Sequence, residues 1–525
     1  MSHTTDPASG AGEQSKGAHA RNGRGAKGEH AKKTKGRGGK GLHRRSFLGG
    51  MAGVGLGAVG AAGATFALLT DGRSNKASAA DATGTLNIPD LLEATTSDGT
   101  TTYTLTAKAG TNEVISGVTS TTAGYNGSYL GPTMKWTKGD TVLMNFTNSL
   151  GADTTVHFHG AHIPAKMDGG PQNAFADGVT WSPTFEVLDE AKTLWYHPHA
   201  LGTTAEQVVH GLAGMIIVED DSDASAALPS DYGVDDIPII LQCLAVDSDG
   251  DIKYDAAGYR GSTVTFPVLV NGTNVDSTTL GFTATKKRTR FRVLNASPAD
   301  IMTVQRSDGG TLTQIATDQG YLTEPTEVTT IRLVAGARAE FVLDLDDAVT
   351  LQAVVTTGWI RGGSGTYDFL TVTPDATDTP DDLPSTLNTI TRYDTSDFTA
   401  RTITLGQNGG TMLINGSAGT TMAGMAMIST TLDSEEIWTI TNSTQLEHSF
   451  HLHDVPYQVM EINGEEPTGV DLGWRDTFEV VGGGSIKIAM KFTDFTDDTY
   501  MYMLHCHLLQ HEDEGMMAAL MVTES

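Results

Sequence analysis

Cysteine is almost absent from this chain, which has only Cys243 and Cys506 among its 525 residues. Two cysteines exclude the framework of several disulfides that stabilises small secreted domains. Cys243 lies in the apolar run 237–244, where a free thiol packs as a small hydrophobic side chain, so we expect no disulfide. Cys506 has a different setting, because a histidine flanks it on each side.

Basic residues are also scarce. The chain has 34 Lys and Arg against 63 Asp and Glu, which gives a formal net charge of -29. A surface this acidic repels the phosphate backbone of nucleic acids. The composition therefore excludes a nucleic-acid partner, and we expect the charge to keep the protein soluble outside the cell.

Long apolar runs are missing except near the N-terminus. Residues 1–45 carry eleven Lys or Arg against three acids, and an Arg-Arg pair precedes a Gly- and Ala-rich apolar run that ends at Leu69. Ala77 to Ala79 provide the small residues of a cleavage site. This order is typical of a twin-arginine export signal, so we expect residues 1–79 to be removed and the mature protein to be extracellular, on the cell surface or periplasmic. A retained membrane anchor is the alternative, but the glycines and the cleavage site favour removal, with no stable membrane insertion afterwards.

Helical periodicity is rare along the rest of the chain, and short alternating or apolar runs recur between turn signals. The clearest runs are 140–148, 213–218, 289–294, 339–345, 437–441 and 485–492. This pattern predicts an all-β fold of sandwiches, with short helices only around Thr203–Val209 and after His505.

The runs form three blocks, which we expect to be three domains: 83–222, 231–374 and 382–525. Polar segments that carry Asp separate the blocks. The middle block has no histidine, whereas ten of the sixteen histidines lie in four short motifs of the outer blocks. The motif histidines are His157 and His159; His197 and His199; His448, His451 and His453; and His505, His507 and His511. We therefore expect one metal cluster between the outer blocks, with the middle block either purely structural or shaping a substrate pocket.

Cys506 has the ligand chemistry of an electron-transfer copper site, in which a thiolate, imidazoles and a weak thioether bind one metal. In an extended segment neighbouring side chains point to opposite faces, so His505 and His507 must face away from the metal that Cys506 binds. The segment predicts a redox enzyme in which electrons pass from one copper to a second metal cluster through a few covalent bonds.

The four motifs, in this order, resemble those of the multicopper oxidases, the family of laccases, bacterial cuprous oxidases and bilirubin oxidases. The resemblance covers the whole mature chain, and the segment from His505 to Met516 is its most specific part. It implies three cupredoxin-like Greek-key β-sandwich domains, with a type 1 copper in domain 382–525 and a trinuclear cluster between the first and third domains. Three places depart from the family pattern without removing a ligand: Ser449, Asp454 and the segment Ala200–Gly202.

The resemblance also implies four copper ions, one of type 1, one of type 2 and two of type 3. The implied type 1 ligands are His448, Cys506, His511 and, as a weak axial ligand, Met516. The implied type 2 ligands are His157 and His451. The implied type 3 ligands are His159, His197 and His507 for one ion, and His199, His453 and His505 for the other.

Two acids match the positions of the family's proton-relay residues. Asp168 follows the first motif by nine residues, and Glu512 directly follows His511. Water formation consumes protons, which a buried carboxylate near the cluster can deliver. An isolated acid would be interpreted as structural, but the matched positions favour a relay, so Asp168 and Glu512 are the candidate catalytic residues.

The resemblance implies an exported oxidase that couples one-electron oxidation of phenols, aromatic amines or bilirubin-like compounds to the four-electron reduction of dioxygen to water. Its partners would be dioxygen and a small aromatic reductant. The alternative is a cuprous oxidase for copper detoxification, with cuprous ion as the reductant. A copper carrier or a nitrite reductase would lack the full set of type 3 ligands, and zinc has no use for a ligand set of one Cys, two His and one Met.

Weaker candidates remain. A group of methionines precedes the third motif and could either bind cuprous ion or fill gaps in a core: Met412, Met422, Met425 and Met427. Asp476 resembles a residue near the type 1 site and is a candidate for substrate contact. His162 and His210 have no motif partner, and we expect them outside the ligand sets.

Overall fold

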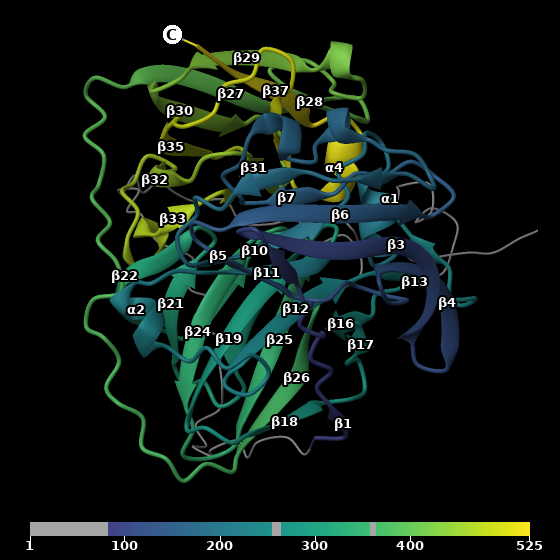
Figure 1. The fold of residues 1–525 in the computed structure, drawn as a ribbon, viewed down its shortest axis with the longest axis vertical. Helices are drawn as coiled ribbons and strands as arrows, with labels where there is room; N and C mark the ends of the chain where they lie inside the picture. Colours follow the sequence, from purple (N-terminus) through teal and green to yellow (C-terminus); the bar gives the residue numbers. More distant parts are fainter. Residues whose placement is uncertain (1–81, 255–263, 358–363, 525) are drawn as a thin grey trace, which may run out of the picture. The chain divides into compact units, whose positions relative to one another are not determined.

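The computed structural model describes residues 82–254, 264–357 and 364–524 (Figure 1). The expected export signal, residues 1–79, lies outside them. Within the described residues the α-helices are short: α1 (Thr204–Val209), α2 (Asp223–Ala227) and α4 (Leu509–Asp513). The 3-10 turns are η1 (Ala165–Met167), η2 (Pro171–Asn173), η3 (Met422–Gly424) and η4 (Gly469–Leu472). None of the helices in this part of the chain is long and apolar enough to cross a membrane.

The first block forms two sheets. One has the order β5-β11-β10-β7: β5 (Met134–Thr137), β11 (Gly214–Glu219), β10 (Lys192–His197) and β7 (His157–His159). The other has the order β2-β3-β6-β8: β2 (Thr95–Ser97), β3 (Thr100–Ile115), β6 (Thr141–Ser149) and β8 (Thr180–Trp181). Two further strands belong to this sheet: β4 (Val118–Tyr125) pairs with β3, and β9 (Thr184–Glu186) pairs with β6.

The described residues of the middle block form three sheets. The largest runs β17 (Thr273–Asn274), β16 (Val268–Val270), β12 (Asp236–Cys243), β19 (Arg288–Asn295), β24 (Arg338–Asp344), β21 (Leu312–Thr317) and β22 (Gly320–Val328). The second runs β1 (Gly84–Thr85), β18 (Leu280–Ala284), β26 (Gly365–Pro374), β25 (Val349–Thr357), β20 (Asp300–Arg306) and β23 (Thr330–Leu333). The smallest runs β14 (Ile252–Lys253), β13 (Ala245–Asp247) and β15 (Val264–Thr265). Strand β1 comes from the start of the first block and pairs in parallel with β18.

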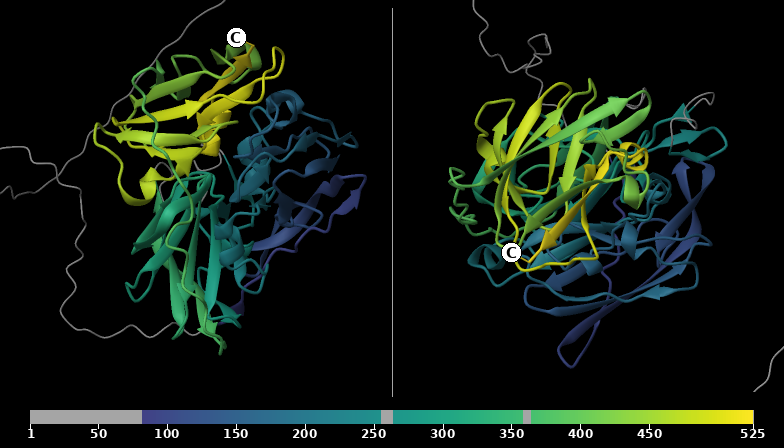
Figure 2. Two further views of the ribbon diagram at one scale, coloured as in Figure 1. Left: turned by 60° about the vertical axis from the view of Figure 1, so that its left-hand side comes forward. Right: turned by 90° about the horizontal axis from the view of Figure 1, so that it is seen from above.

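The last block forms two sheets, whose strands carry the green to yellow colours in Figure 2. One runs β28 (Thr411–Ile414), β27 (Thr399–Asn408), β30 (Glu435–Asn442), β35 (Ser485–Lys491), β32 (Tyr457–Ile462) and β33 (Trp474–Arg475). The other runs β29 (Ala426–Thr431), β37 (Met517–Thr523), β36 (Tyr502–Cys506), β31 (His448–Leu452) and β34 (Thr477–Val480).

Alternating side chains explain why these segments form two-layered sheets. Along β6 and β30 every second residue is buried, as expected for a strand with one face against a core. Each of the six runs singled out in the sequence lies on a strand, and helices α1 and α4 occupy the two places where helices were expected. The prediction of an all-β fold is therefore confirmed.

Three large apolar cores fill the space between the sheets. The core of the last block is centred on residues such as Trp438, Phe450 and Ile488, and it also takes in Ala165 and Ala335 from the other two blocks. Burying one large apolar side chain stabilises a fold by about 1.5–3 kcal/mol. This core therefore contains residues of all three blocks, together with Phe450 and Cys506 from the histidine motifs.

Candidate metal centre

Strand pairing brings the histidine motifs together two by two. β7 and β10 are antiparallel neighbours, with His157 opposite His197. β31 and β36 are likewise antiparallel, with His451 opposite His505. Motifs that are far apart in the sequence thus share a sheet.

Strand alternation then separates the histidines from the apolar residues between them. Phe158 packs into the core of the first block and Leu452 into the core of the last block. The histidines on either side of each of these two residues point the other way, as alternation along a strand requires.

The eight histidines that the resemblance assigns to type 2 and type 3 copper form one buried cluster, and none is more than 1% exposed. Ring nitrogens lie within 4.8 Å of one another in three sets: His157, His451 and His453; His157, His159 and His197; and His199, His453 and His505. The His507 ring centroid lies 4.9 Å from that of His159 and 5.3 Å from that of His197. The cluster thus joins strands of the first and last blocks.

In several of these rings an oxygen atom fixes the outer nitrogen. His157 Nδ1 lies 2.8 Å from the carbonyl oxygen of Asp168, and His451 Nδ1 lies 2.9 Å from that of Asp476. His197 Nδ1 lies 2.8 Å from the carbonyl oxygen of Pro198. A carbonyl accepts only from a protonated nitrogen, so Nε2 of each ring carries the lone pair. These Nε2 atoms are buried without a hydrogen-bond partner, as expected for metal ligands whose tautomer is fixed by an outer oxygen.

Three rings converge through their inner nitrogens. His453 Nε2 lies 3.2 Å from His199 Nε2 and 3.3 Å from His505 Nε2. The outer Nδ1 atoms of all three rings lie within 3.1 Å of carboxylate oxygens, which favours a proton on each Nδ1. The three Nε2 lone pairs then face one another, an arrangement that a bound cation would stabilise.

Burial favours the neutral form of six of these imidazoles, which is the form that binds metals. It lowers the pKa of His453 to about 3, against the pull of the nearby Asp168 carboxylate. Burial, reinforced by neighbouring imidazoles, also places several pKa values well below the ordinary range: those of His159, His197, His199, His451 and His507.

Both candidate relay acids touch the cluster. Asp168 Oδ2 lies 2.7 Å from His453 Nδ1, and Asp168 Oδ1 lies 3.2 Å from His157 Nδ1. Glu512 Oε1 lies 3.1 Å from His199 Nδ1, and Glu512 Oε2 lies 3.1 Å from His505 Nδ1. Burial alone would raise the pKa of Asp168, but the imidazoles of His157 and His453 hold that pKa below its usual range. The Asp168 carboxylate therefore hydrogen-bonds His453, and each of the two acids lies close to two histidines.

A second buried group consists of Cys506, His448 and His511. The Cys506 sulfur lies 3.4 Å from His448 Nδ1 and 3.7 Å from His511 Nδ1, and the two nitrogens are 3.1 Å apart. Ligand atoms about 2 Å from a shared metal are roughly 3 to 4 Å from one another, so these spacings suit a single ion. Burial raises the pKa of Cys506 to about 12 and lowers that of His448 to about 4. A metal is therefore needed to hold the thiolate.

Met516 belongs to the same core cluster as Cys506, and its carbonyl accepts a 3.0 Å hydrogen bond from the Cys506 backbone. The next residue, Met517, packs in a different cluster with Met425 and Met503. These placements favour Met516 over Met517 as the neighbour of the thiolate.

The comparisons with known proteins agree with this geometry. Family models described as multicopper oxidase match residues 106–223 and 381–525. The chain is 33% identical over 439 residues to "Multicopper oxidase mco" of Staphylococcus aureus, across 81% of this chain and 90% of that protein. It is 30% identical over 462 residues to "Cell division protein FtsP" of Escherichia coli K12, across 85% of this chain and 94% of that protein. The chain belongs to the multicopper oxidase family.

A solved structure supports the same assignment. The laccase-like multicopper oxidase CueO from the lignin-degrading bacterium Ochrobactrum sp. matches with a TM-score of 0.74 and 29% identity, over 83% of this chain and 100% of that chain. Multicopper oxidases have cupredoxin-like β-sandwich domains, bind copper and use dioxygen with a reductant. This oxidoreductase has the donor atoms for that metal, since imidazole suits copper and thiolate with imidazole suits an electron-transfer copper site.

Asp476 does not occupy the place expected for it in this multicopper oxidase. It is only 1% exposed, and the Arg338 guanidinium donates hydrogen bonds of 2.7 and 2.6 Å to its two carboxylate oxygens. Its Oδ1 also lies 3.3 Å from His159 Nε2. The expected substrate contact is therefore wrong, because a side chain this buried cannot meet a reductant. The sequence alone gives no indication that Asp476 pairs with Arg338.

The histidines without a motif partner lie outside the ligand sets, as expected. His162 Nδ1 lies 2.8 Å from Asp454 Oδ1, and its Nε2 lies 3.1 Å from Asp494 Oδ2. His210 Nδ1 lies 2.6 Å from the carbonyl oxygen of Glu206, one turn earlier along α1. Cys243 is a free, buried thiol, as the sequence predicts.

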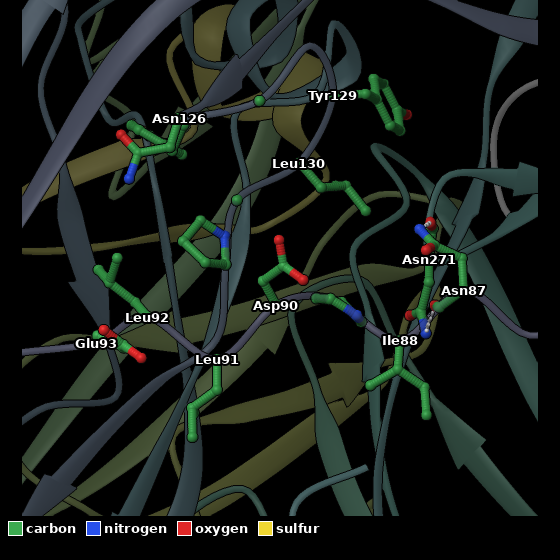
Figure 3. A pocket seen from close by; sticks show the side chains of 15 residues that line it. Asn87, Ile88, Asp90, Leu91, Leu92, Glu93, Asn126, Tyr129, Leu130 and Asn271 are labelled. Carbon is green, nitrogen blue, oxygen red and sulfur yellow. Dashed lines mark hydrogen bonds between the residues drawn. The ribbon is translucent and has the colours of Figure 1, made fainter.

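A cavity of about 410 Å³ also opens in the oxidase, between the segment 87–93, the loop 125–132 and Asn271. Figure 3 shows Asp90 and Leu130 within it, and the hydrogen bonds that join Asn87 to Asn271 at its edge. Its lining contains no histidine or cysteine. The cavity therefore contains none of the candidate copper ligands.

Proposed function

We propose that this multicopper oxidase couples one-electron oxidation of phenols, aromatic amines or bilirubin-like compounds to the four-electron reduction of dioxygen to water. The observation that carries the proposal is the position of Cys506. Its sulfur lies between two histidines of the second group, and its chain neighbours His505 and His507 belong to the eight-histidine cluster. One short peptide thus connects an electron-accepting site to a site that could hold several metals.

The proposed copper content is four ions per chain. The proposed type 1 ligands are His448, Cys506, His511 and the axial Met516. The proposed type 2 ligands are His157 and His451. The proposed type 3 ligands are His159, His197 and His507 for one ion and His199, His453 and His505 for the other. The last set, like the type 1 set without Met516, has its donor atoms within 4.8 Å of one another, which supports these two assignments.

When bound, copper supplies one-electron redox chemistry at the type 1 site and a place to reduce dioxygen at the cluster. The chain determines where the electrons go. Cys506 connects to His505 and His507 through the peptide backbone, and all three side chains are buried away from solvent. Exclusion of water favours transfer along this path over loss to other acceptors.

We propose that Asp168 and Glu512 relay protons to the cluster. Each acid is 1% exposed, and each has its carboxylate oxygens within 3.2 Å of ring nitrogens of two cluster histidines. A carboxylate in this place can take up a proton and pass it toward oxygen without leaving its position. The same contacts orient the rings, so the two acids have both roles in this proposal.

The organisation of the chain is part of the proposal. We propose three domains at 83–222, 231–374 and 382–525, and export by the twin-arginine route to the periplasm, the cell surface or the medium. Apart from β1, each described sheet draws its strands from one of these blocks, which supports the division.

A cuprous oxidase is the second candidate, and a methionine cluster favours it. Met425, Met503 and Met517 pack together with Met422 and Met501 at their edge. Met427 follows on β29 and is 51% exposed. Thioether sulfur suits the soft cuprous ion, so this surface could present such an ion to the protein.

Steady-state oxygen consumption distinguishes the two candidates. The copper-loaded protein would be supplied in parallel with a substituted phenol, bilirubin and cuprous ion, with the C506S variant as the inactive control. We expect turnover of an aromatic reductant in the absence of added copper. Turnover of cuprous ion alone, or strong activation of phenol oxidation by added copper, would support the second candidate. An absence of oxygen consumption with all three reductants would contradict both.

A further inference from the structure

The middle block supplies no histidine, yet one of its turns touches the histidine cluster. The turn lies at 334–337, and Arg338 is the first residue of the strand that follows, β24. A Cβ atom added at Gly336 would lie 2.9 Å from the His507 ring, and the φ of Gly336 is +86°. The carbonyl oxygen of Ala335 accepts a 2.7 Å hydrogen bond from Ser449 Oγ, and the Ser449 carbonyl accepts one of 2.6 Å from the His507 backbone. The turn thus packs directly against one cluster histidine.

Arg338 directly follows this turn and is completely buried. Two of its hydrogen bonds go to the Asp476 carboxylate. Its Nε donates to the carbonyl oxygen of Thr193 at 3.0 Å, on the strand that also carries His197. The remaining donors reach the carbonyl oxygens of Asp318 at 2.9 Å and Gly336 at 3.3 Å. All five N–H groups of the guanidinium therefore have acceptors, and these acceptors come from all three blocks.

Asp476, which Arg338 holds in place, in turn contacts two histidines of the cluster. Its carbonyl oxygen accepts from His451 Nδ1 at 2.9 Å, and its Oδ1 faces His159 Nε2 at 3.3 Å. The His159 and His451 rings are stacked, with centroids 3.7 Å apart. A proton on the nitrogen that faces Asp476 leaves the lone pair of His159 on Nδ1, which is buried and has no hydrogen-bond partner.

The backbone beside His159 packs tightly against the ion pair of Arg338 and Asp476. Gly160 directly follows His159 and has a φ of +88°. A Cβ atom there would lie 2.5 Å from Asp476 Oδ2 and 2.6 Å from Arg338 Nη2. Glycine therefore allows the backbone beside His159 to approach the ion pair closely.

We propose that Arg338 is a positioning residue for the copper cluster. It holds Asp476, whose carboxylate faces His159 Nε2 and whose backbone carbonyl accepts from His451 Nδ1, and these two contacts fix the rotation and the tautomer of the rings. Through Arg338 the histidine-free middle block sets the geometry of metal ligands that it does not itself provide. This inference rests on the proposed function, because it assigns His159 and His451 to copper.

The test replaces Arg338 by Lys, which keeps the positive charge but cannot bind both carboxylate oxygens in one plane. Asp476→Asn is the second variant, and it acts on the same link from the other side. Arg290→Lys is the matched control. Arg290 is also buried, on the neighbouring strand β19, and pairs with Glu340 without a contact to the histidines.

The copper-loaded proteins would be compared by the electron paramagnetic resonance signal of type 2 copper and by copper retention against a chelator. Loss of an outer partner of a metal ligand costs roughly 10- to 100-fold in metal affinity. We expect R338K and D476N to lose cluster copper at roughly 10- to 100-fold lower chelator concentration and to show an altered type 2 signal. R290K should match the wild type in both measurements.

Two outcomes would overturn the inference. The first is an R338K protein with the same type 2 signal and copper retention as R290K. The second, which decides if R338K does not fold, is a D476N protein that matches the wild type. A wild-type protein that binds no copper or shows no type 2 signal would instead contradict the proposed function.

Discussion

The histidine cluster depends on which nitrogen of each ring is held by an oxygen atom. Carbonyl oxygens hold His157, His197 and His451, and carboxylates hold the three rings whose Nε2 atoms converge. An imidazole fixed in this way has one lone pair and one direction in which to offer it. The chain therefore presents preformed ligands that need little rearrangement to bind copper.

Replacing Met516 by Leu should keep the type 1 copper and raise its reduction potential. A thioether is a weak donor that stabilises the oxidised ion, and leucine fills a similar volume without donating. Potentiometric titration of the blue absorption band in both proteins measures the change. An unchanged or lower potential would exclude Met516 as the axial ligand, and the same substitution at Met517 is the matched control.

Glu512→Gln and Asp168→Asn should slow the oxygen reaction much more than the oxidation of substrate. Each change keeps the size and much of the hydrogen bonding but removes the group that carries the proton. General acid–base groups contribute roughly 10² to 10⁴ in rate, so we expect reoxidation to slow by about 10²-fold. Stopped-flow absorbance separates fast reduction of type 1 copper from its slow reoxidation under oxygen. Reoxidation at the wild-type rate in both variants would leave these acids with only the role of orienting histidines.

The sequence was sufficient to predict the candidate ligands, because the residue types that bind copper are few and their spacing is short. It could not predict what holds them. Asp476 was expected to contact substrate, but Arg338 pairs with it from 138 positions away. The sequence also could not predict the contacts of Asp168 with His453 and of His162 with Asp454. Such contacts depend on the packing of distant strands, which periodicity along the chain does not contain.

Among the secondary-structure elements, the loops that follow β7, β31 and β35 meet at His162. Its ring bridges Asp454 and Asp494, and its backbone N–H donates to the Asp189 carboxylate just before β10. Lys192 Nζ also lies 2.8 Å from Asp189 Oδ1, and the Phe495 ring lies against the imidazole of His162. Burial alone would lower the pKa of His162, but these carboxylates outweigh it and raise the pKa to about 9. The charged histidine thus joins three loops.

The stability that His162 contributes should depend on pH in a defined direction. Its folded-state pKa lies above the unfolded value of about 6.5, so the contribution is complete below about pH 6.5 and is lost as the pH rises through about 9. We expect His162→Gln to lower the free energy of unfolding by about 1–3 kcal/mol at pH 6 and by much less at pH 10. Denaturant titration of the copper-free proteins measures this difference. An equal loss at both pH values would show that His162 acts by packing and not by charge.

At the scale of the whole molecule, two blocks supply the proposed ligands, and we infer that the third holds them in place. The all-β architecture was predictable from alternating runs, since one buried face leaves a period of two in the sequence. The pairing of β1 with β18 was not, because two residues carry no periodic signal. The chain is similar in sequence both to a protein named as an oxidase and to one named as a cell division protein, so the fold alone does not determine the function.

The most direct test of the account is the copper content and visible spectrum of the purified protein beside its Cys506→Ser variant. We predict a blue wild type with close to four coppers per chain, since thiolate bound to copper with two histidines gives that colour. The variant should be colourless and retain about three coppers, because the histidine cluster does not need the thiolate. An oxidised, fully copper-loaded wild type without colour, or a variant that keeps both its colour and its full copper content, would contradict the proposed sites.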